Sequence, residues 1–461
     1  MIDPVLDALR NAAASGRLLI VTGAGVSHAL QRKDGSPLPS WGELLQSLRR
    51  QADPALLAPH AALLDELLPA DADVLGKVHG DALIEAAEIM QGCFAPGQFE
   101  QATAELCREQ AATCTETHRR IADLWPAGVI TFNYDQGHEQ AFRETGANAE
   151  AIRYDEAGKL KARLAEEHSG GPFILKAHGC TSEPPSLVLT SSSYRAVLSK
   201  NRTYRLFLQH CFVRYTVLIV GFALRDRDFD QLMSALEIEL GIPHQTHAFI
   251  AKRPKASSPE GLVKRADWAA VTARFGLNSI FVDDFDRIPP LLESIGTQAG
   301  SIIEQLVDAS ASTDGPTRSA AHDQAIGLGR IGRAQMRSAL LERLDRPGLD
   351  LAIRSEIIYA FRGIADNDAR VPARLMKELE RAANGASGPD AKADAECAAH
   401  ALIVLRGLRI KDTKALKAAV GALKEPALLA KLNSLEAVCT IPRLQSYALA
   451  AAAELESRHA P

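Results

Sequence analysis

The feature that most constrains this fold is a short apolar run that ends in a glycine-rich turn. Leu18–Thr22 reads LLIVT, and Gly23-Ala24-Gly25 follows it directly. A buried strand that feeds such a turn is typical of α/β sheets, in which backbone N–H groups of the turn can approach a phosphate. Taken alone, a two-glycine turn is equally well explained as a tight connection between a strand and a helix. The run therefore predicts an α/β sheet first and a nucleotide site second.

Six further apolar runs predict more strands of the same sheet. These runs are Gly128–Phe132, Phe173–Lys176, Leu187–Thr190, Thr216–Val220, His247–Ala251 and Asn278–Val282. Helical patterns such as Tyr204–Phe212 and Phe229–Leu240 separate several of them. Alternating strands and helices predict an α/β fold with a doubly wound, mostly parallel sheet, in which ligands bind at the carboxyl ends of the strands.

Helical patterns occupy two other parts of the chain. Residues from about 41 to 125 predict a helical insertion within the sheet domain, which we expect to span 1–305. The stretch 306–317 contains small polar residues with Gly and Pro and is predicted to be a linker. Helix follows helix over 318–461, which predicts an all-α regulatory or assembly domain.

Composition excludes several classes of protein. A length of 461 residues predicts more than one domain, and a net charge of −5 gives no electrostatic reason to expect nucleic acid as a partner. No apolar run approaches the roughly 20 residues that cross a bilayer, and no signal-peptide pattern is present, so we expect a cytoplasmic protein without membrane contact. The seven cysteines form no C-x-x-C pair, which predicts neither a zinc ribbon nor any other metal site.

Polar residues follow two of the other predicted strands, and a glycine follows a third. Asn133 and Asp135 come after Gly128–Phe132, and His178-Gly179 comes after Phe173–Lys176. Gly221 ends the run Thr216–Val220. Each has a structural alternative, because Asn and Asp shape turns and a lone His after a strand often packs or caps. The residues alone leave those alternatives open.

Together the ordered motifs resemble the sirtuin superfamily. Gly23-Ala24-Gly25-Val26-Ser27 resembles its G-A-G-[IV]-S element, and Thr131–Asp135 resembles its T-x-N-[YI]-D motif. Pro39–Leu45 resembles the P-x-W-x-x-L-L segment of a bacterial sirtuin-like branch that lacks the zinc ribbon. Many members of that branch hydrolyse NAD in antiphage defence. The resemblance covers about residues 10–300.

The resemblance implies a Rossmann-like fold, NAD as the substrate and a role for each motif. Asn133 would orient water or the nicotinamide ribose, Asp135 would support the nicotinamide pocket, and His178 would act as general base. Ala223 replaces the serine of the family's G-x-S-L-x-D-x-D turn, which puts one cofactor contact in doubt. The residues implied to bind NAD are Gly23, Ala24, Gly25, Ser27, Gly221 and Asp226.

The function expected from this resemblance is an NAD glycohydrolase that releases nicotinamide and ADP-ribose. Such an effector would deplete NAD during antiphage defence, so it would need regulation. We therefore expect a homo-oligomer, and a protein trigger or partner that acts through the C-terminal helices. One alternative is a module that binds NAD or ADP-ribose without turnover. Another is a protein deacylase, which the absence of zinc cysteines disfavours.

Overall fold

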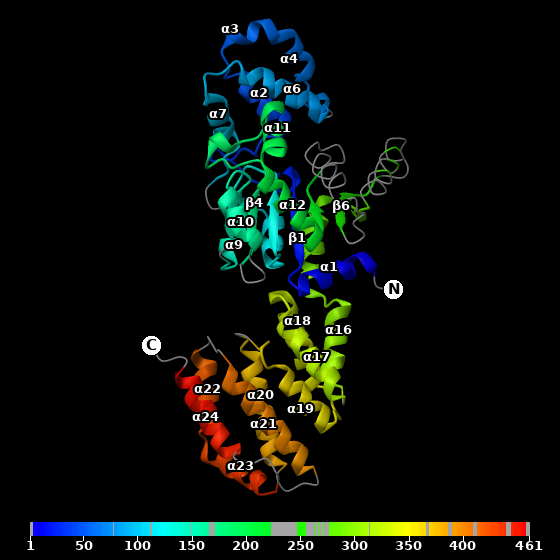
Figure 1. Cartoon of the computed structure of the whole chain (residues 1–461), viewed down its shortest axis with the longest axis vertical. Coiled ribbons are helices and arrows are strands. Elements are labelled where there is room, and N and C mark those ends of the chain that lie inside the picture. Colours follow the sequence, from blue (N-terminus) through cyan, green and yellow to red (C-terminus); the bar gives the residue numbers. More distant parts are fainter. Residues whose placement is uncertain are drawn as a thin grey trace. The chain divides into compact units, whose positions relative to one another are not determined.

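The computed structural model divides the chain into two compact units, Met1–Gly296 and Thr297–Pro461, which we describe separately (Figure 1). The structure describes residues 3–76, 78–110, 113–147, 149–165, 171–222, 247–254, 263, 266, 270, 276–312, 314–365, 368–385, 390–408, 413–438 and 444–457.

The first unit is built around a parallel sheet of seven strands among the described residues, in the order β3-β4-β2-β1-β5-β6-β7. The strands are β1 (Leu18–Thr22), β2 (Gly128–Thr131), β3 (Glu150–Arg153), β4 (Phe173–Lys176), β5 (Thr216–Val220), β6 (Ala248–Lys252) and β7 (Asn278–Val282). Thr22 is in register with Thr131 on one side and with Val220 on the other. The carboxyl ends of β2, β1 and β5 are therefore level. The predicted parallel α/β sheet is confirmed.

The order of the strands places the glycine turn at a topological switch point. From β1 the chain moves to β2 on one side of the sheet, and it later returns to β5 on the other. Crevices at such points are where open α/β sheets bind ligands. Every residue of β1 is buried, which explains why an unbroken apolar run without alternation encodes this strand.

One predicted strand is wrong. Leu187–Thr190 is extended but does not join the sheet, because its N–H groups are used within the loop. The Val188 N–H donates to the His178 carbonyl (3.1 Å), and the next two N–H groups donate to the Ser193 hydroxyl (3.2 and 2.9 Å). Thr190 then caps α11 (Ser191–Lys200).

Strand β3 is an element that the apolar patterns do not predict. Two of its four residues, Glu150 and Ala151, are exposed, and Ile152 is the only one that is fully buried. The strand lies at the edge of the sheet and pairs only with β4. An edge strand with one buried side chain carries a weak hydrophobic signal.

Helices surround the sheet and form a separate block at one end of it (Figure 1). The remaining helices of this unit are α1 (Pro4–Ala14), α2 (Trp41–Arg49), α3 (Pro54–Leu57), α4 (Ala61–Leu67), α5 (Ala72–Leu75), α6 (Gly80–Gln91), α7 (Gln98–Leu106), α8 (Glu116–Asp123), α9 (Gly137–Glu144), α10 (Ala157–Ala165), α12 (Arg202–Arg214) and α15 (Ile288–Thr297). Helices α2 to α7 share a hydrophobic core with Leu187 and Leu189. The predicted helical insertion therefore packs on the loop that follows β4.

The second unit consists of helices in the part that the structure describes. They are α16 (Ser301–Ser310), α17 (Gly315–Ile326), α18 (Arg330–Leu344), α19 (Leu351–Ala360), α20 (Arg370–Asn384), α21 (Ala391–Gly407), α22 (Thr413–Leu423), α23 (Pro426–Val438) and α24 (Leu444–Ser457). The stretch predicted as a linker, 306–317, includes the end of α16 and the start of α17. None of the described helices of the chain is both long and apolar enough to cross a membrane.

Candidate active site

The glycine turn packs directly on the turn after β5. The Gly23 N–H donates to the Val220 carbonyl (3.0 Å), and the Gly25 N–H donates to the Gly221 carbonyl (2.9 Å). A Cβ atom on Gly23 would lie 2.8 Å from the Gly221 oxygen, and Gly221 itself has a φ of +80°. The glycines therefore allow two backbones to approach closely, a role that a phosphate contact alone would not require.

The N–H groups of this turn are largely used inside it. The Val26 N–H donates to the Gly23 carbonyl (3.2 Å), and the Ser27 N–H donates to the Ala24 carbonyl (3.1 Å), which closes one 3₁₀ turn. Ala24 is exposed, and its N–H has no acceptor among the described residues. Within this turn, the Ala24 N–H can therefore donate a hydrogen bond to an anionic group of a ligand.

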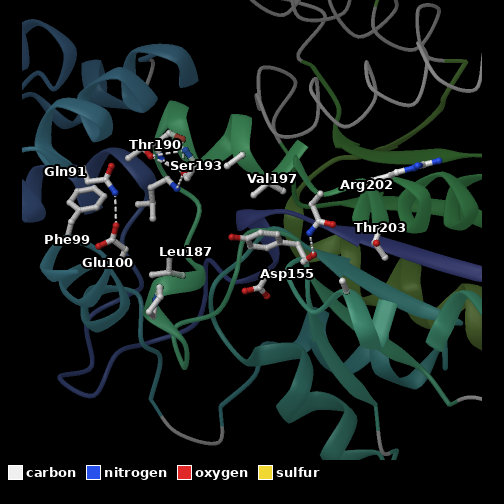
Figure 2. A pocket seen from close by; sticks show the side chains of 16 residues that line it. Gln91, Phe99, Glu100, Asp155, Leu187, Thr190, Ser193, Val197, Arg202 and Thr203 are labelled. Carbon is white, nitrogen blue, oxygen red and sulfur yellow. Dashed lines mark hydrogen bonds between the residues drawn. The ribbon is translucent and has the colours of Figure 1, made fainter. Parts of the chain in front are cut away.

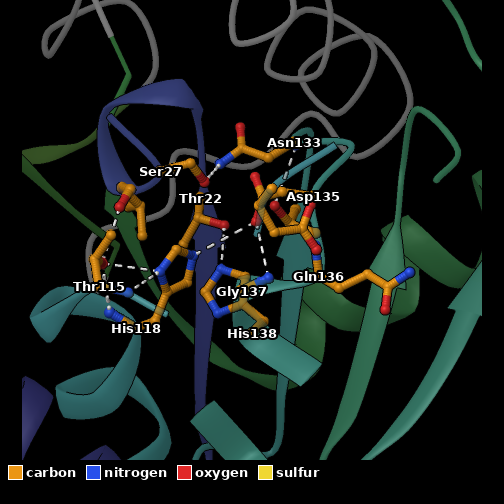
Figure 3. A network of polar contacts seen from close by, with 12 residues as sticks. Thr22, Ser27, Thr115, His118, Asn133, Asp135, Gln136, Gly137 and His138 are labelled. Carbon is orange, nitrogen blue, oxygen red and sulfur yellow. Dashed lines mark hydrogen bonds and ion pairs between the residues drawn. The ribbon is translucent and has the colours of Figure 1, made fainter. Parts of the chain in front are cut away.

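Asn133 connects the turn after β2 to the glycine turn (Figure 3). Its side-chain Nδ2 donates to the Gly23 carbonyl (2.9 Å) and to the Ser27 hydroxyl (2.8 Å). Both protons of the carboxamide are therefore occupied, which fixes its orientation. The Oδ1 atom accepts no hydrogen bond within the described residues, so it can accept one from a ligand or a water.

Asp135 lies beneath the same turn rather than at its surface. Its carboxyl group is 5% exposed, and Oδ1 accepts a hydrogen bond from the Gly137 N–H (2.9 Å) at the start of α9. The same oxygen faces Nε2 of His118 across 4.0 Å (Figure 3). The structure thus places Asp135 beside residues that support the turn.

His178 follows β4 and is 6% exposed. Its ring packs edge-on against Phe132 (4.8 Å between centroids) and Tyr194 (4.9 Å). Phe132 in turn contacts Phe222 (5.4 Å) after β5. Burial lowers the pKa of His178 to about 3, so the imidazole is neutral at physiological pH.

The predicted site residues that the structure describes follow adjacent strands at one edge of the sheet. Residues Gly23 to Ser27, Asn133, Asp135, His178 and Gly221 lie after β1, β2, β4 and β5. Asp226 and the substituted Ala223 lie outside the described residues, as does the predicted helix Phe229–Leu240.

A buried polar cluster beneath the site is not predicted by the motifs. His118 and His138 pack edge-on (4.4 Å), and Nε2 of His138 shares a hydrogen bond with the Thr22 hydroxyl (2.9 Å). Lys176 Nζ donates to the Asp135 carbonyl and lies 3.7 Å from Glu139. Burial opposes the charge of Lys176, but nearby carboxylates, Glu139 foremost, outweigh it and raise the pKa. The cluster packs the ends of β1, β2 and β4 together.

The buried histidines predict a loss of stability in mild acid. Burial lowers the pKa of His118 to about 4, of His178 to about 3 and of His138 well below its ordinary value. Unfolded histidine binds a proton near pH 6.5, so the folded state is fully stable above that pH and loses stability as pH falls toward the folded pKa values. Each histidine contributes up to about 1.4 kcal/mol per pH unit. Glu109, whose pKa burial raises, acts in the opposite direction, whereas burial also lowers the pKa of His210 and His322, which adds to the effect.

We therefore expect the thermal midpoint to fall steeply between pH 7 and about pH 5. The control is His138→Gln, which removes one of the three titrations and should make that slope shallower. A midpoint that stays constant over this range would contradict the assignment of three neutral buried imidazoles.

A cavity of about 630 Å³ lies beside the loop after β4 (Figure 2). Its walls come from the helical block, through Phe99 and Glu100, from Leu187 and Leu189 of the loop, and from the start of α12. None of the sequence-predicted site residues lines it. In the described part of the chain, no group of three or more His, Cys, Asp or Glu side chains is arranged to hold a metal ion.

The parallel sheet, with polar residues at the ends of β1, β2 and β4, corresponds to a recognised domain class. Residues 127–271 match the SIR2-like domain family. The chain is also similar to proteins named NAD(+) hydrolase ThsA. It is 22% identical over 198 residues to the protein of Cytobacillus dafuensis, which covers 40% of this chain and 39% of that protein.

Two further relatives carry the same name. The identity is 23% over 188 residues for the protein of Bacillus cereus (strain MSX-D12), covering 39% of this chain and 38% of that protein. It is 25% over 198 residues for the protein of Enterococcus faecium, covering 39% and 40%. The similarity thus spans about two fifths of each relative's length.

Proposed function

We propose that this chain is an NAD glycohydrolase that cleaves NAD into nicotinamide and ADP-ribose. The observation that carries the proposal is the fixed carboxamide of Asn133, whose Nδ2 is bound to Gly23 and Ser27 while its Oδ1 can still accept a hydrogen bond. The SIR2-like domain and the relatives named NAD(+) hydrolase support the same substrate.

The reaction requires positioning more than strong acid catalysis. The bond between nicotinamide and ribose breaks with its electrons leaving on nicotinamide, and the ribose carbon passes through an oxocarbenium-like state. A water oxygen then bonds to that carbon and releases one proton. Asn133 Oδ1 would orient the water or a ribose hydroxyl, the neutral His178 imidazole would accept a hydrogen bond from it, and the released proton would pass to solvent. Ala24, through its N–H, would contact the pyrophosphate.

The role of His178 is tested with two substitutions. His178→Ala removes the imidazole, and His178→Phe keeps an aromatic ring between Phe132 and Tyr194 without an acceptor. Both variants are expected to lose NAD turnover by about 100-fold or more, because both lack the imidazole nitrogen that we propose accepts a hydrogen bond from the reacting group. Turnover is measured as nicotinamide release, and circular dichroism checks the fold. If His178→Phe keeps wild-type turnover, His178 acts only by packing.

The cellular role extends the proposal. NAD depletion by such an enzyme would serve antiphage defence, and the helical unit would provide regulation or assembly, through oligomer formation or a protein trigger. The second candidate is a module that binds NAD or ADP-ribose without turnover. NAD binding without any nicotinamide release, by wild type and by the Asn133 and His178 variants alike, would favour that module.

A further inference from the structure

We propose that His118 is a positioning residue that holds Asp135, and through it the turn that carries Asn133. The inference rests on the proposed NAD cleavage. His118 precedes residues 127–271, the segment that matches the SIR2-like domain family. The argument depends on the contacts of its imidazole with α8, with Asp135 and with α9.

The first step is the protonation state of the imidazole. His118 is the third residue of α8, and its Nδ1 accepts a hydrogen bond from the N–H of Thr115, the N-cap (3.2 Å). Nδ1 also lies 2.8 Å from the Thr115 hydroxyl, but a backbone N–H can only donate, so we assign the lone pair to Nδ1 and the proton of the neutral ring to Nε2. His118 thereby replaces the usual Glu or Gln of a capping box.

The second step is what Nε2 faces. It lies 4.0 Å from Oδ1 of Asp135 and has no hydrogen-bond partner among the residues that the structure describes. His118 is fully buried, so no bulk solvent can satisfy this donor or weaken its attraction to the carboxylate. The acceptor that this nitrogen faces is thus the oxygen that also receives the Gly137 N–H.

The third step is the tight fit around the ring. A Cβ atom on Gly137 would lie 2.7 Å from Cε1 of His118 and 3.0 Å from the Asp135 carboxylate. The imidazole therefore rests on the backbone that donates to Asp135. Asp135 is two residues from Asn133, so a displaced carboxylate would shift the turn that places Oδ1 of Asn133.

The same helix start also contacts the glycine turn. The Thr115 hydroxyl donates to the Val26 carbonyl (3.0 Å), so the N-terminus of α8 is bound to the turn after β1. The His118 contact with Asp135 reaches the turn after β2. One helix terminus thus fixes both turns that Asn133 joins.

The test compares two substitutions at position 118 in the full chain. In His118→Gln the side-chain oxygen can accept from the Thr115 N–H, as in an ordinary capping box, and the amide can donate to Asp135. His118→Leu fills the buried space but supplies neither atom. If His118 only packs, His118→Leu should have a kcat equal to or higher than that of His118→Gln. If His118 positions Asp135, His118→Gln should have the higher kcat.

We expect His118→Gln to keep kcat for NAD cleavage within about threefold of wild type, and His118→Leu to lower it by about tenfold or more with a smaller change in KM. His118→Phe repeats the comparison if His118→Leu does not fold. Wild-type kcat in the folded apolar variant, or an equal loss in His118→Gln, would overturn the proposal.

A second measurement requires no turnover and separates this inference from the proposed function. Hydrogen exchange of the peptide that covers 133–137 should be about tenfold faster in His118→Leu and unchanged in His118→Gln. If wild type cleaves no NAD, the proposed function fails, and exchange alone decides the role of His118. Equal exchange in wild type and both variants would overturn it.

Discussion

Asn133→Ala is expected to lower NAD turnover by about 100- to 1,000-fold while leaving the protein folded. The substitution removes Oδ1, which we propose orients the attacking water or a ribose hydroxyl. It also removes two donors, to the Gly23 carbonyl and the Ser27 hydroxyl, that fix the glycine turn. The measurement is nicotinamide release at saturating NAD, so that weakened binding does not mimic lost chemistry.

The matched control is Ser27→Ala. It deletes one partner of the Asn133 carboxamide and keeps both Oδ1 and the bond to the Gly23 carbonyl. We expect a change of about tenfold or less, mainly in KM, which corresponds to the loss of one hydrogen bond. If Asn133→Ala retains more than about a third of wild-type turnover, Asn133 takes no part in the mechanism.

Gly179→Ala is expected to cause the second large effect, a loss of about 3 kcal/mol or more in the free energy of unfolding. Gly179 has a φ of +84°, and a Cβ atom there would overlap the carbonyl of Ser186. The backbone at 179 cannot move away without displacing the adjacent His178. Turnover should therefore fall together with the thermal midpoint.

Gly97→Ala separates the clash from backbone strain. Gly97 has a similar φ of +78°, but a Cβ atom there would meet nothing within 4 Å. This control should cost only about 1 kcal/mol. If the two variants unfold at the same midpoint, the contact between Gly179 and Ser186 does not constrain the loop.

Much of the sheet could be predicted because its central strands are short runs in which almost every side chain is buried. β1 and β2 illustrate this, since all nine of their residues are buried. Reading a short apolar run as a strand gave the wrong result at Leu187–Thr190. This run is apolar because Leu187 and Leu189 enter the core of the helical block. An apolar run shows burial, but it does not show which neighbour buries it.

The candidate site could be predicted in part. The strand-end motifs indicated Gly23, Asn133 and His178, and these residues follow neighbouring strands. Their contacts could not be predicted, because the bond from Asn133 to Gly23 joins residues 110 positions apart. His118 left only a weak local signal, a histidine at the third position after a capping threonine.

The most direct test of the central claim is product release from NAD by this chain of 461 residues. Nicotinamide and ADP-ribose are quantified together over time, because hydrolysis must release them in equal amounts. We predict equal release by wild type and almost none by Asn133→Ala. Nicotinamide release without matching ADP-ribose, or products formed equally by the Asn133→Ala variant, would contradict the account.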